Sequence, residues 1–296
     1  MITNLKITNK RGEEFEFGHQ NRITKGLNLS GLIADVNFSA GSGAGSKYQN
    51  TRLSNREFEI EFMMMKAQYD EVQMDGKRGD LYSIFNPELN PLRLDITMSD
   101  DKKYYLDANL QSTPIVPPDK ATNNNGAWQR VLLQFLATDP YIYEKDSRRV
   151  EIAEWIGAFE FPLCIESGVG FEVGYRSQSM FVDVDNAGQS KTGMSITFRA
   201  LATVTHPALI NVETQEELKL NITMTKGDVV EVSTYDGAFG ITLIRGGTRS
   251  DEFNAIGLYS TFLQLEPGNN VFRYDALSGV DNMEISLTYR AKSVGV

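Results

Sequence analysis

The sequence is poor in the residues that most metal sites and catalytic triads require. Among its 296 residues there are one cysteine, Cys164, and two histidines, His19 and His206. A single cysteine cannot form an intrachain disulfide, and the apolar run around it predicts a buried, inert thiol. Neither histidine stands in a recognisable nucleophile context or at the spacing of a zinc site. We therefore predict no catalytic, metal-binding or cofactor-binding residue, and no enzymatic activity.

Long apolar runs and basic clusters are also missing. No window approaches the roughly 18 apolar residues of a membrane span, and the first residues lack the pattern of a signal peptide. The formal net charge is −10, and no run of Lys or Arg is longer than two residues. A general nucleic-acid binder requires a basic face. We expect no membrane association, no stable nucleic-acid binding, and synthesis in a reducing cytoplasm.

The length is typical of two domains of about 150 residues each, which we place at 1–146 and 147–296. One helical segment is expected at Gln68–Ile84, interrupted at Gly76 and Gly79, since a glycine costs up to about 1 kcal/mol inside a helix. The composition of Ser39–Lys47 predicts a flexible linker, and Glu144–Val150 is a candidate interdomain linker. Strands of the first domain are expected at Ile2–Thr8, Glu14–Phe17, Leu27–Phe38, Glu57–Phe62, Leu92–Met98, Tyr104–Leu110 and Trp128–Ala137. The first two should form a hairpin, as should Leu92–Met98 with Tyr104–Leu110.

The second half contains short strand-like segments separated by turn signals. This pattern is typical of an antiparallel sandwich or jelly roll, so the whole chain is expected to be mainly β with one short helical segment. The turns Asn186–Gly188 and Glu266–Asn270 are expected to close hairpins. The expected strands are Phe159–Ile165, Phe181–Val184, Met194–Ala200, Leu218–Met224, Val229–Thr234, Ile241–Ile244, Thr261–Leu265, Val271–Tyr274 and Met283–Tyr289.

Three motifs imitate functional sites without meeting their requirements. Gly41–Lys47 suggests a phosphate loop, but a strand and not a helix is expected after it. Asp183–Gly188 begins like a calcium loop, but later ligand positions hold side chains without oxygen. The acid pairs Asp100-Asp101 and Glu216-Glu217 are expected in exposed turns, where they cannot act together as glycosidase carboxylates.

Two groups of residues resemble the signature of a phage family. The first is Asp139, Pro140, Tyr141 and Tyr143, directly after an apolar strand. The second joins a strand with Gly227, Asp228, Val230 and Val232 to a later segment with Phe262, Leu265, Pro267, Gly268, Asn269 and Asn270. A helix with Leu81, then Asn86-Pro87, two strands, a long loop and a further strand precede Asp139 in the order of the same family, so the resemblance covers nearly the whole chain. The chain thereby resembles the distal tail proteins (Dit) of siphophages, a family of phage tail components.

The resemblance implies an α+β N-terminal ring domain and a C-terminal galectin-like antiparallel β-sandwich. It implies a structural role in the tail tip or baseplate, as a homohexameric hub ring. The implied partners are the tail tube protein, the tail-associated (tape-end) protein, and receptor-binding or baseplate proteins. The implied location is the virion, at the phage tail tip, after synthesis in the bacterial host cytoplasm.

A carbohydrate-binding β-sandwich adhesin that acts as a monomer is the alternative, because the implied sandwich is galectin-like. Galectin-type recognition uses a His, Asn and Arg group with a Trp under the sugar ring. The sequence has no His-x-Asn-x-Arg motif, and Trp155 is the one tryptophan of the second half. Fold analogy alone does not establish the function.

Exposed loops are the expected interface material if the chain assembles with other tail proteins. We expect them at Ser39–Asn50, Pro114–Gly126 and Gly246–Ile256. The candidate interface residues in these loops are Ser39, Lys47, Tyr48, Pro117, Asn124, Arg249 and Asp251.

Overall fold

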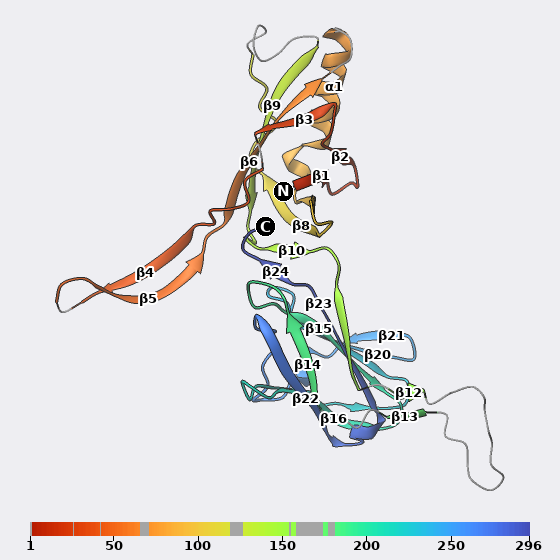
Figure 1. The fold of residues 1–296 in the computed structure, drawn as a ribbon. Coiled ribbons are helices and arrows are strands. Elements are labelled where there is room, and N and C mark those ends of the chain that lie inside the picture. The colour runs from red at the N-terminus through yellow and green to blue at the C-terminus, as the bar shows by residue number, and fades with distance from the viewer. Residues whose placement is uncertain are drawn as a thin grey trace. The chain divides into compact units, whose positions relative to one another are not determined.

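The computed structural model describes residues 2–25, 27–41, 43–65, 71–118, 127–153, 155–157, 174–176 and 181–296. The chain forms two compact units (Figure 1). The first comprises Met1–Asp146 together with Ser293–Val296, so the end of the chain returns to the unit in which the chain begins. The second comprises Ser147–Lys292. Antiparallel strands dominate and the described residues contain one α-helix, which confirms the mainly β fold class. None of the described helices is long and apolar enough to cross a membrane.

The first unit is built on one antiparallel sheet. Its strands follow the order β2-β1-β7-β8-β9-β6-β3, with β10 beside β8 and β24 beside β10. The strands are β1 (Ile2–Thr8), β2 (Glu14–Glu16), β3 (Asn21–Lys25), β6 (Arg56–Met65), β7 (Leu92–Met98), β8 (Lys103–Leu110), β9 (Trp128–Ala137), β10 (Ile142–Glu144) and β24 (Lys292–Ser293). The expected hairpins β1–β2 and β7–β8 are confirmed.

This sheet curls so that β2 and β6, which stand near its two ends, approach each other across the core. Strict alternation in β6 places Phe58, Ile60 and Phe62 in the core and leaves the intervening side chains outside. Phe15 of β2 and the following Phe17 lie with their ring centroids 5.5 Å and 5.2 Å from that of Phe62. Because β2 and β6 stand near opposite ends of the strand order, these contacts close the sheet into a barrel-like core.

The helix α1 (Glu71–Ile84) packs on this core and is followed by the short 3-10 helix η1 (Pro87–Leu89). Met74, Leu81 and Phe85 are buried, at spacings that place them on one face of the helix. The helix continues through Gly76 and Gly79, so the expected interruption there is wrong. Burial of this apolar face offsets the glycine cost of about 1 kcal/mol each.

The second unit is a sandwich of two antiparallel sheets. One sheet has the order β11-β23-β15-β19-β20-β21, and the other has β14-β22-β16-β17 with β18 beside β16. The strands are β11 (Arg148–Ala153), β14 (Phe181–Asn186), β15 (Met194–Ala200), β16 (Val204–Asn211), β17 (Glu217–Lys219), β18 (Thr223–Met224), β19 (Val229–Ser233), β20 (Gly240–Arg245), β21 (Thr248–Asp251), β22 (Gly268–Ser278) and β23 (Met283–Tyr289). The short strands β12 (Trp155–Gly157) and β13 (Gly174–Arg176) pair separately, and the 3-10 helices are η2 (Phe253–Ala255) and η3 (Val280–Asn282).

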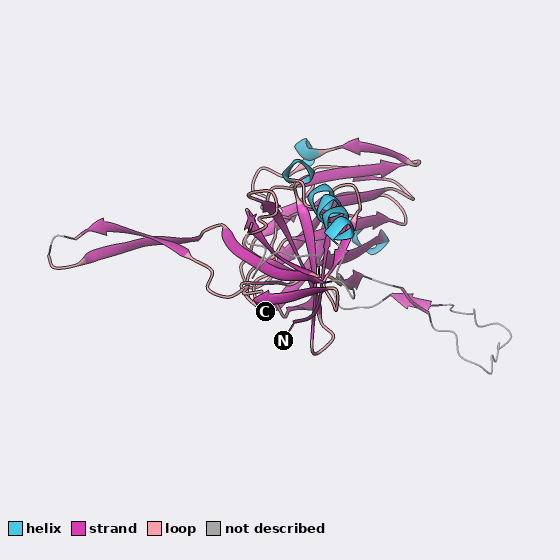
Figure 2. Cartoon of the chain, turned by 90° about the horizontal axis from the view of Figure 1, so that it is seen from above, coloured by secondary structure: helices cyan, strands magenta, loops and turns pink. Residues whose placement is uncertain are grey.

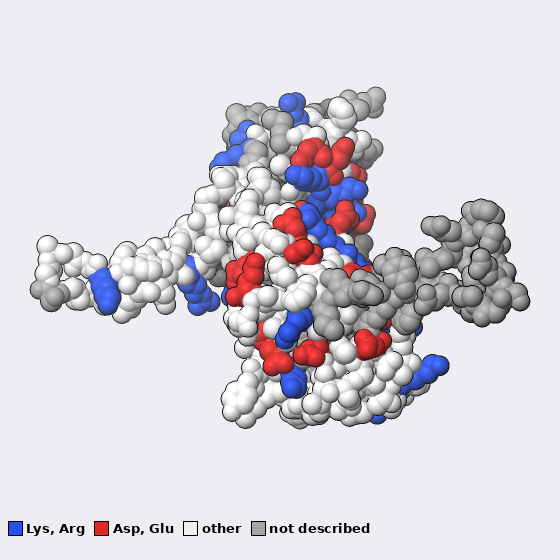
Figure 3. Space-filling model, turned by 60° about the horizontal axis from the view of Figure 1, so that its bottom comes forward, with Lys and Arg blue, Asp and Glu red and all other residues white. Residues whose placement is uncertain are grey.

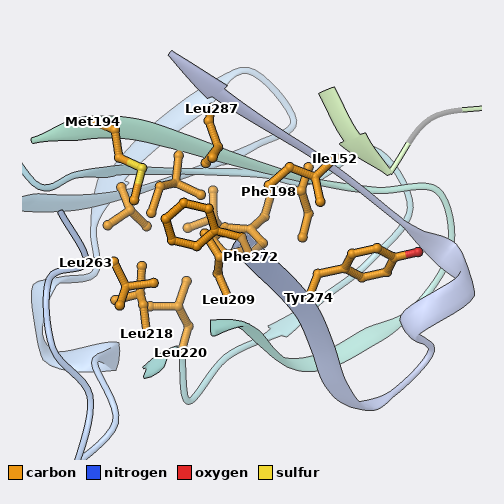
Figure 4. Packing of buried hydrophobic residues seen from close by; sticks show 14 of the residues in the cluster. Ile152, Met194, Phe198, Leu209, Leu218, Leu220, Leu263, Phe272, Tyr274 and Leu287 are labelled. Atoms are coloured by element: carbon orange, nitrogen blue, oxygen red, sulfur yellow. The ribbon is translucent and has the colours of Figure 1, made fainter. Parts of the chain in front are cut away.

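The core of the second unit lies between its two sheets. Phe198 and Leu287 come from one sheet, and Leu209 and Phe272 from the other, and their side chains meet in the middle (Figure 4). All four are inaccessible to solvent. The expected antiparallel sandwich is therefore confirmed.

Several strand predictions in the second half need correction. Segment 261–265 is a loop, apart from an isolated bridge between Thr192 and Leu265. The expected strand Leu218–Met224 consists of the end of β17 and the separate β18. The strands β11, β12, β13, β16 and β21 were not expected, and β11 includes the last three residues of the candidate linker at Glu144–Val150. His206, expected in a turn, lies within β16 with φ of 50°. The expected strand Phe159–Ile165, with Cys164, lies outside the described residues.

Candidate interface surfaces

The glycine-rich segment expected as a linker is the tip of a long hairpin. β4 (Ala34–Ala40) and β5 (Ser46–Leu53) pair from Ala34 with Leu53 to Ala40 with Ser46. The linker prediction is wrong because both ends of the segment lie in paired strands, and Gly45, with φ of 94°, adopts a conformation that glycine allows at little cost. The expected strand Leu27–Phe38 likewise begins only at Ala34. We call residues 34–53 the arm.

The arm has no core of its own. In β4 and β5 every residue except Ser39 and Leu53 is exposed, including the candidate residues Lys47 and Tyr48. Phe38 and Tyr48 are 60% and 57% exposed and contact each other edge to face with ring centroids 6.5 Å apart. The arm stands away from the sheet of its own unit (Figure 2), and the face in Figure 3 shows it largely without charge. An isolated two-stranded hairpin is marginally stable at best in water, so this surface suits a partner.

A buried arginine anchors the base of the arm. Arg56 is 3% exposed and donates from Nε to Pro140 O at 2.8 Å, from Nη2 to Val294 O at 2.7 Å, and from Nη1 to Leu29 O. Burial lowers the pKa of its guanidinium. The residue therefore joins the chain before the arm, the corner after β9 and the returning C-terminus.

The outward glutamates of β6 have polar partners on the neighbouring strand β9. Glu61 forms an ion pair with Arg130 at 3.3 Å, and Glu59 accepts a hydrogen bond from Gln134 at 2.9 Å. Arg56, at the start of the same strand, donates to backbone carbonyl oxygens and not to these glutamates. The Arg56 side chain points into the unit because alternate residues of β6, starting at Arg56, face the core.

The sheet of the first unit has an open edge at β3. Among the described strands, β3 pairs with β6 alone. An opening of about 210 Å³ lies between this edge and the start of β1, lined by residues 2–5, 17–18 and 22–23. Ile2 and Ile23 are half-buried there. An exposed strand edge can accept a further strand from another chain.

The signature around Asp139 forms a corner after β9. The Asp139 carboxylate accepts hydrogen bonds from Tyr141 N at 3.1 Å and from the Tyr143 hydroxyl at 2.7 Å. Tyr143 stacks on Tyr105 with ring centroids 5.5 Å apart. Pro140 supplies one of the carbonyl groups that Arg56 binds. These four signature residues thus hold the chain where β9 turns into β10.

The signature around Asp228 is a second structural corner. Asp228 is 2% exposed, and its carboxylate accepts from Arg245 Nη2 at 2.6 Å and from Thr225 N at 2.7 Å. The hydrogen bonds from Arg245, followed by those from Thr225, keep the pKa of Asp228 below its usual value. Gly227, with φ of 89°, provides the turn into β19. This arrangement ties the start of β19 to the end of β20.

The segment Pro267–Asn270 does not close a hairpin, contrary to expectation. Gly268 begins β22, which pairs with β14, so that Asn186 faces Gly268. The buried Asn270 side chain donates to Glu266 O and Gly268 O, both at 2.9 Å, and accepts from Glu266 N at 2.9 Å. Asn269 donates to Asp183 at 3.2 Å. The predicted hairpin at Asn186–Gly188 is wrong for the same reason, since β14 and β15 lie in different sheets.

The remaining candidate loop residues lie in different surroundings. Arg249 and Asp251 are exposed on the edge strand β21, which forms a hairpin with β20 through Gly246 and Gly247. Arg249 forms an ion pair with Glu231. Pro117 is half-buried, and Asn124 lies outside the described residues. The segment Gly246–Ile256 is thus largely ordered as β21 and η2.

Sequence analysis missed an apolar surface on the second unit. Residues 253–262, which we call the apolar loop, carry Leu258 and Tyr259 with exposures of 88% and 91%. Phe262 contacts Phe253 and Phe239 with ring centroids 5.8 Å and 4.8 Å apart. The run Leu258-Tyr259 between a glycine and two hydroxyl residues is the one signal in the sequence that could have indicated it.

No group of three or more His, Cys, Asp or Glu side chains in the described ranges is arranged to hold a metal ion. The pairs Asp100-Asp101 and Glu216-Glu217 contribute to no such group, and Asp100 forms an ion pair with Lys102 at 3.3 Å.

Comparison with protein families gives two matches in this chain. A phage tail protein RIFT-related domain matches residues 10–137, in the first unit. The C-terminal domain of the siphovirus-type tail component matches residues 187–292, in the second. No curated protein matches the sequence.

Solved structures share the fold over the full length. The crystal structure of the Dit protein of phage SPP1, described as a paradigm of the hub adsorption apparatus in phages that infect Gram-positive bacteria, has a TM-score of 0.68 at 13% identity, covering 97% of this chain and 98% of that one. A chain of the phage P2 baseplate in its activated conformation with calcium has a TM-score of 0.50 at 13% identity and full coverage of both chains. The same baseplate with strontium gives 0.51 at 13% identity, with 99% of each chain covered.

Proposed function

We propose that copies of this chain close into a hexameric hub ring at the tail tip, because the chain belongs to the siphovirus-type tail component family and is a distal tail protein. The chain is a structural component of the virion tail. In the proposal the first unit builds the ring and stacks on the tail tube protein. The second unit holds receptor-binding or baseplate proteins, and the tail-associated (tape-end) protein docks on the same ring. Synthesis takes place in the host cytoplasm.

The arm is the observation that supports the ring. It exposes Val36, Phe38 and Tyr48 on a hairpin that gains no burial from its own unit. The arm and the open β3 edge are two different surfaces of the same unit. An arm that docks at the β3 edge of the next copy therefore forms a head-to-tail contact. Head-to-tail contacts between identical chains generate rings when the rotation closes. The strand-like arm and the unpaired strand edge are chemically suited to each other.

The test is the mass of the purified protein in solution. Light scattering on the size-separated chain, with negative-stain images of the same peak, should give a ring of six times 33.1 kDa. The double variant Phe38→Ser/Tyr48→Ser should be monomeric yet folded, because neither side chain belongs to a core. Leu258→Ser/Tyr259→Ser is the matched control, since it removes two exposed apolar side chains from the second unit and should leave the ring intact.

A monomer that forms no ring even with the tail tube protein added would contradict the proposal. It would favour the carbohydrate-binding adhesin, which a glycan array would then test. A ring that persists in Phe38→Ser/Tyr48→Ser would leave the hub role standing and exclude the arm as its contact.

A further inference from the structure

The apolar loop of the second unit exposes more apolar surface than its core requires. Leu258 and Tyr259 lie almost wholly in solvent, while Phe253 and Phe239 are each more than two-fifths exposed around Phe262. Large apolar groups gathered on one loop mark interaction sites in soluble proteins. Tyrosine is also enriched among residues that dominate binding energy. Neither the core nor the family signature accounts for Leu258 and Tyr259.

The loop is held in place by its neighbour β17. Gly257 N donates to Lys219 O at 2.8 Å, and Thr261 N donates to Glu217 O at 2.8 Å. Between these two points the Ser260 hydroxyl donates to Lys219 O at 3.0 Å and accepts from Lys219 N at 2.9 Å. A loop fixed on both sides presents its side chains in one arrangement, which lowers the entropy lost on binding.

The charge around the loop selects the kind of partner. The sequence from 250 to 272 contains Asp251, Glu252 and Glu266 and no Lys or Arg. Asp236 accepts a hydrogen bond from Gln264 at 3.0 Å, but its charge is balanced by Lys292 at 3.8 Å. In β17, the positive charge of Lys219 and the negative charge of Glu217 add up to no net charge. The apolar loop thus has an acidic border at its start, formed by Asp251 and Glu252, and this charge complements Lys and Arg.

A second copy of the chain does not meet this requirement. Each copy would present the same acidic border, and the chain as a whole has a net charge of −10. Like charges placed opposite each other at an interface disfavour association. The complementary occupant is a different protein.

We propose that the apolar loop is the docking surface for another tail-tip protein, through a segment that places apolar side chains on Leu258 and Tyr259 and Lys or Arg beside Asp251 and Glu252. This inference rests on the proposed place of the chain in the tail tip, and it does not depend on the ring. It assigns the contact to named residues of the second unit.

The experiment measures binding to each of the other tail-tip proteins encoded by the same phage, purified one at a time. One of them should bind the wild-type chain, and Leu258→Ser/Tyr259→Ser should weaken that binding roughly 30-fold, as expected for loss of dominant contacts. Leu277→Ser is the matched control, because this side chain is 69% exposed in β22 and should bind as the wild type does. Asp251→Asn/Glu252→Gln should slow association and reduce its dependence on salt.

Three results would overturn the inference. They are absence of binding to every tail-tip protein, equal binding by the wild type and Leu258→Ser/Tyr259→Ser, and a photo-crosslink from position 259 that joins two copies of this chain. The ring is measured separately on the same samples. If the ring forms but no partner binds, this inference is overturned and the hub proposal stands. If a partner binds through the apolar loop but no ring forms, the hub proposal is overturned and this inference stands.

Discussion

Replacing Arg56 by methionine should loosen three distant segments of the first unit at once. Its guanidinium donates to the carbonyl groups of Leu29, Pro140 and Val294. In Arg56→Met these acceptors lose their donor, at a net cost of about 1 kcal/mol each. Removing the buried charge recovers part of its desolvation cost. We therefore expect the unfolding free energy of the first unit to fall by about 2–3 kcal/mol.

The assay is a urea titration read by hydrogen-exchange mass spectrometry, so that each unit is followed by its own peptides. Arg52→Met is the matched control, because Arg52 is exposed in the arm and its loss should change stability by no more than about 0.5 kcal/mol. Exchange should rise together in segments 27–33, 138–141 and 293–296, while peptides of β15 and β19 stay unchanged. Equal stability of Arg56→Met and Arg52→Met would refute the role of the buried guanidinium, as would a rise confined to one segment.

Two further predictions concern the second unit. Asp228→Asn should lower the unfolding free energy of the second unit by about 2 kcal/mol at pH 7. The pKa of Asp228 is lower in the folded state than in the unfolded state. The stability difference should therefore be present above the unfolded pKa of about 3.9 and shrink as the pH falls through the folded pKa. Urea titrations from pH 7 to pH 3 check this, and a difference that stays constant would contradict it. Gly279→Ala should cost at least about 3 kcal/mol, since the backbone there has φ of 76° and an added Cβ would lie 2.2 Å from Thr203 O. Gly240→Ala meets nothing within 4 Å and serves as the control in thermal unfolding.

Strands with strong alternation could be predicted from the sequence, often to the residue. β9, β15 and β23 have the predicted bounds, because each packs one face on a core and shows that face in its side-chain pattern. β16 lacks such a signal: it contains Pro207 and a His206 with positive φ, and its pairing with β22 overrides these local preferences. Local composition cannot report a partner strand that lies about 70 residues away in the chain.

The arm shows the opposite error. Its tip has the composition of a linker, and its strands lack alternation because neither face packs on a core. The side chains that could have indicated it are Phe38 and Tyr48, which stand on both sides of a glycine-rich turn. Without a buried face, only the pairing itself distinguishes such a hairpin from a flexible segment.

The family prediction is confirmed, and several of the residues that carried it serve the fold of one chain. Asp139 holds the turn after β9, Asp228 binds Arg245, and Asn270 closes the start of β22, so each is required by the fold of one chain. The arm side chains Phe38 and Tyr48 belong to no described core, and neither do Leu258 and Tyr259 of the apolar loop, so these positions can vary with the partner without loss of the fold. Signature residues of this kind therefore identify the fold. The surfaces that contact other proteins must be sought where apolar side chains lie exposed on ordered backbone. In this chain those places are Phe38 and Tyr48 in the first unit, and Leu258 and Tyr259 in the second.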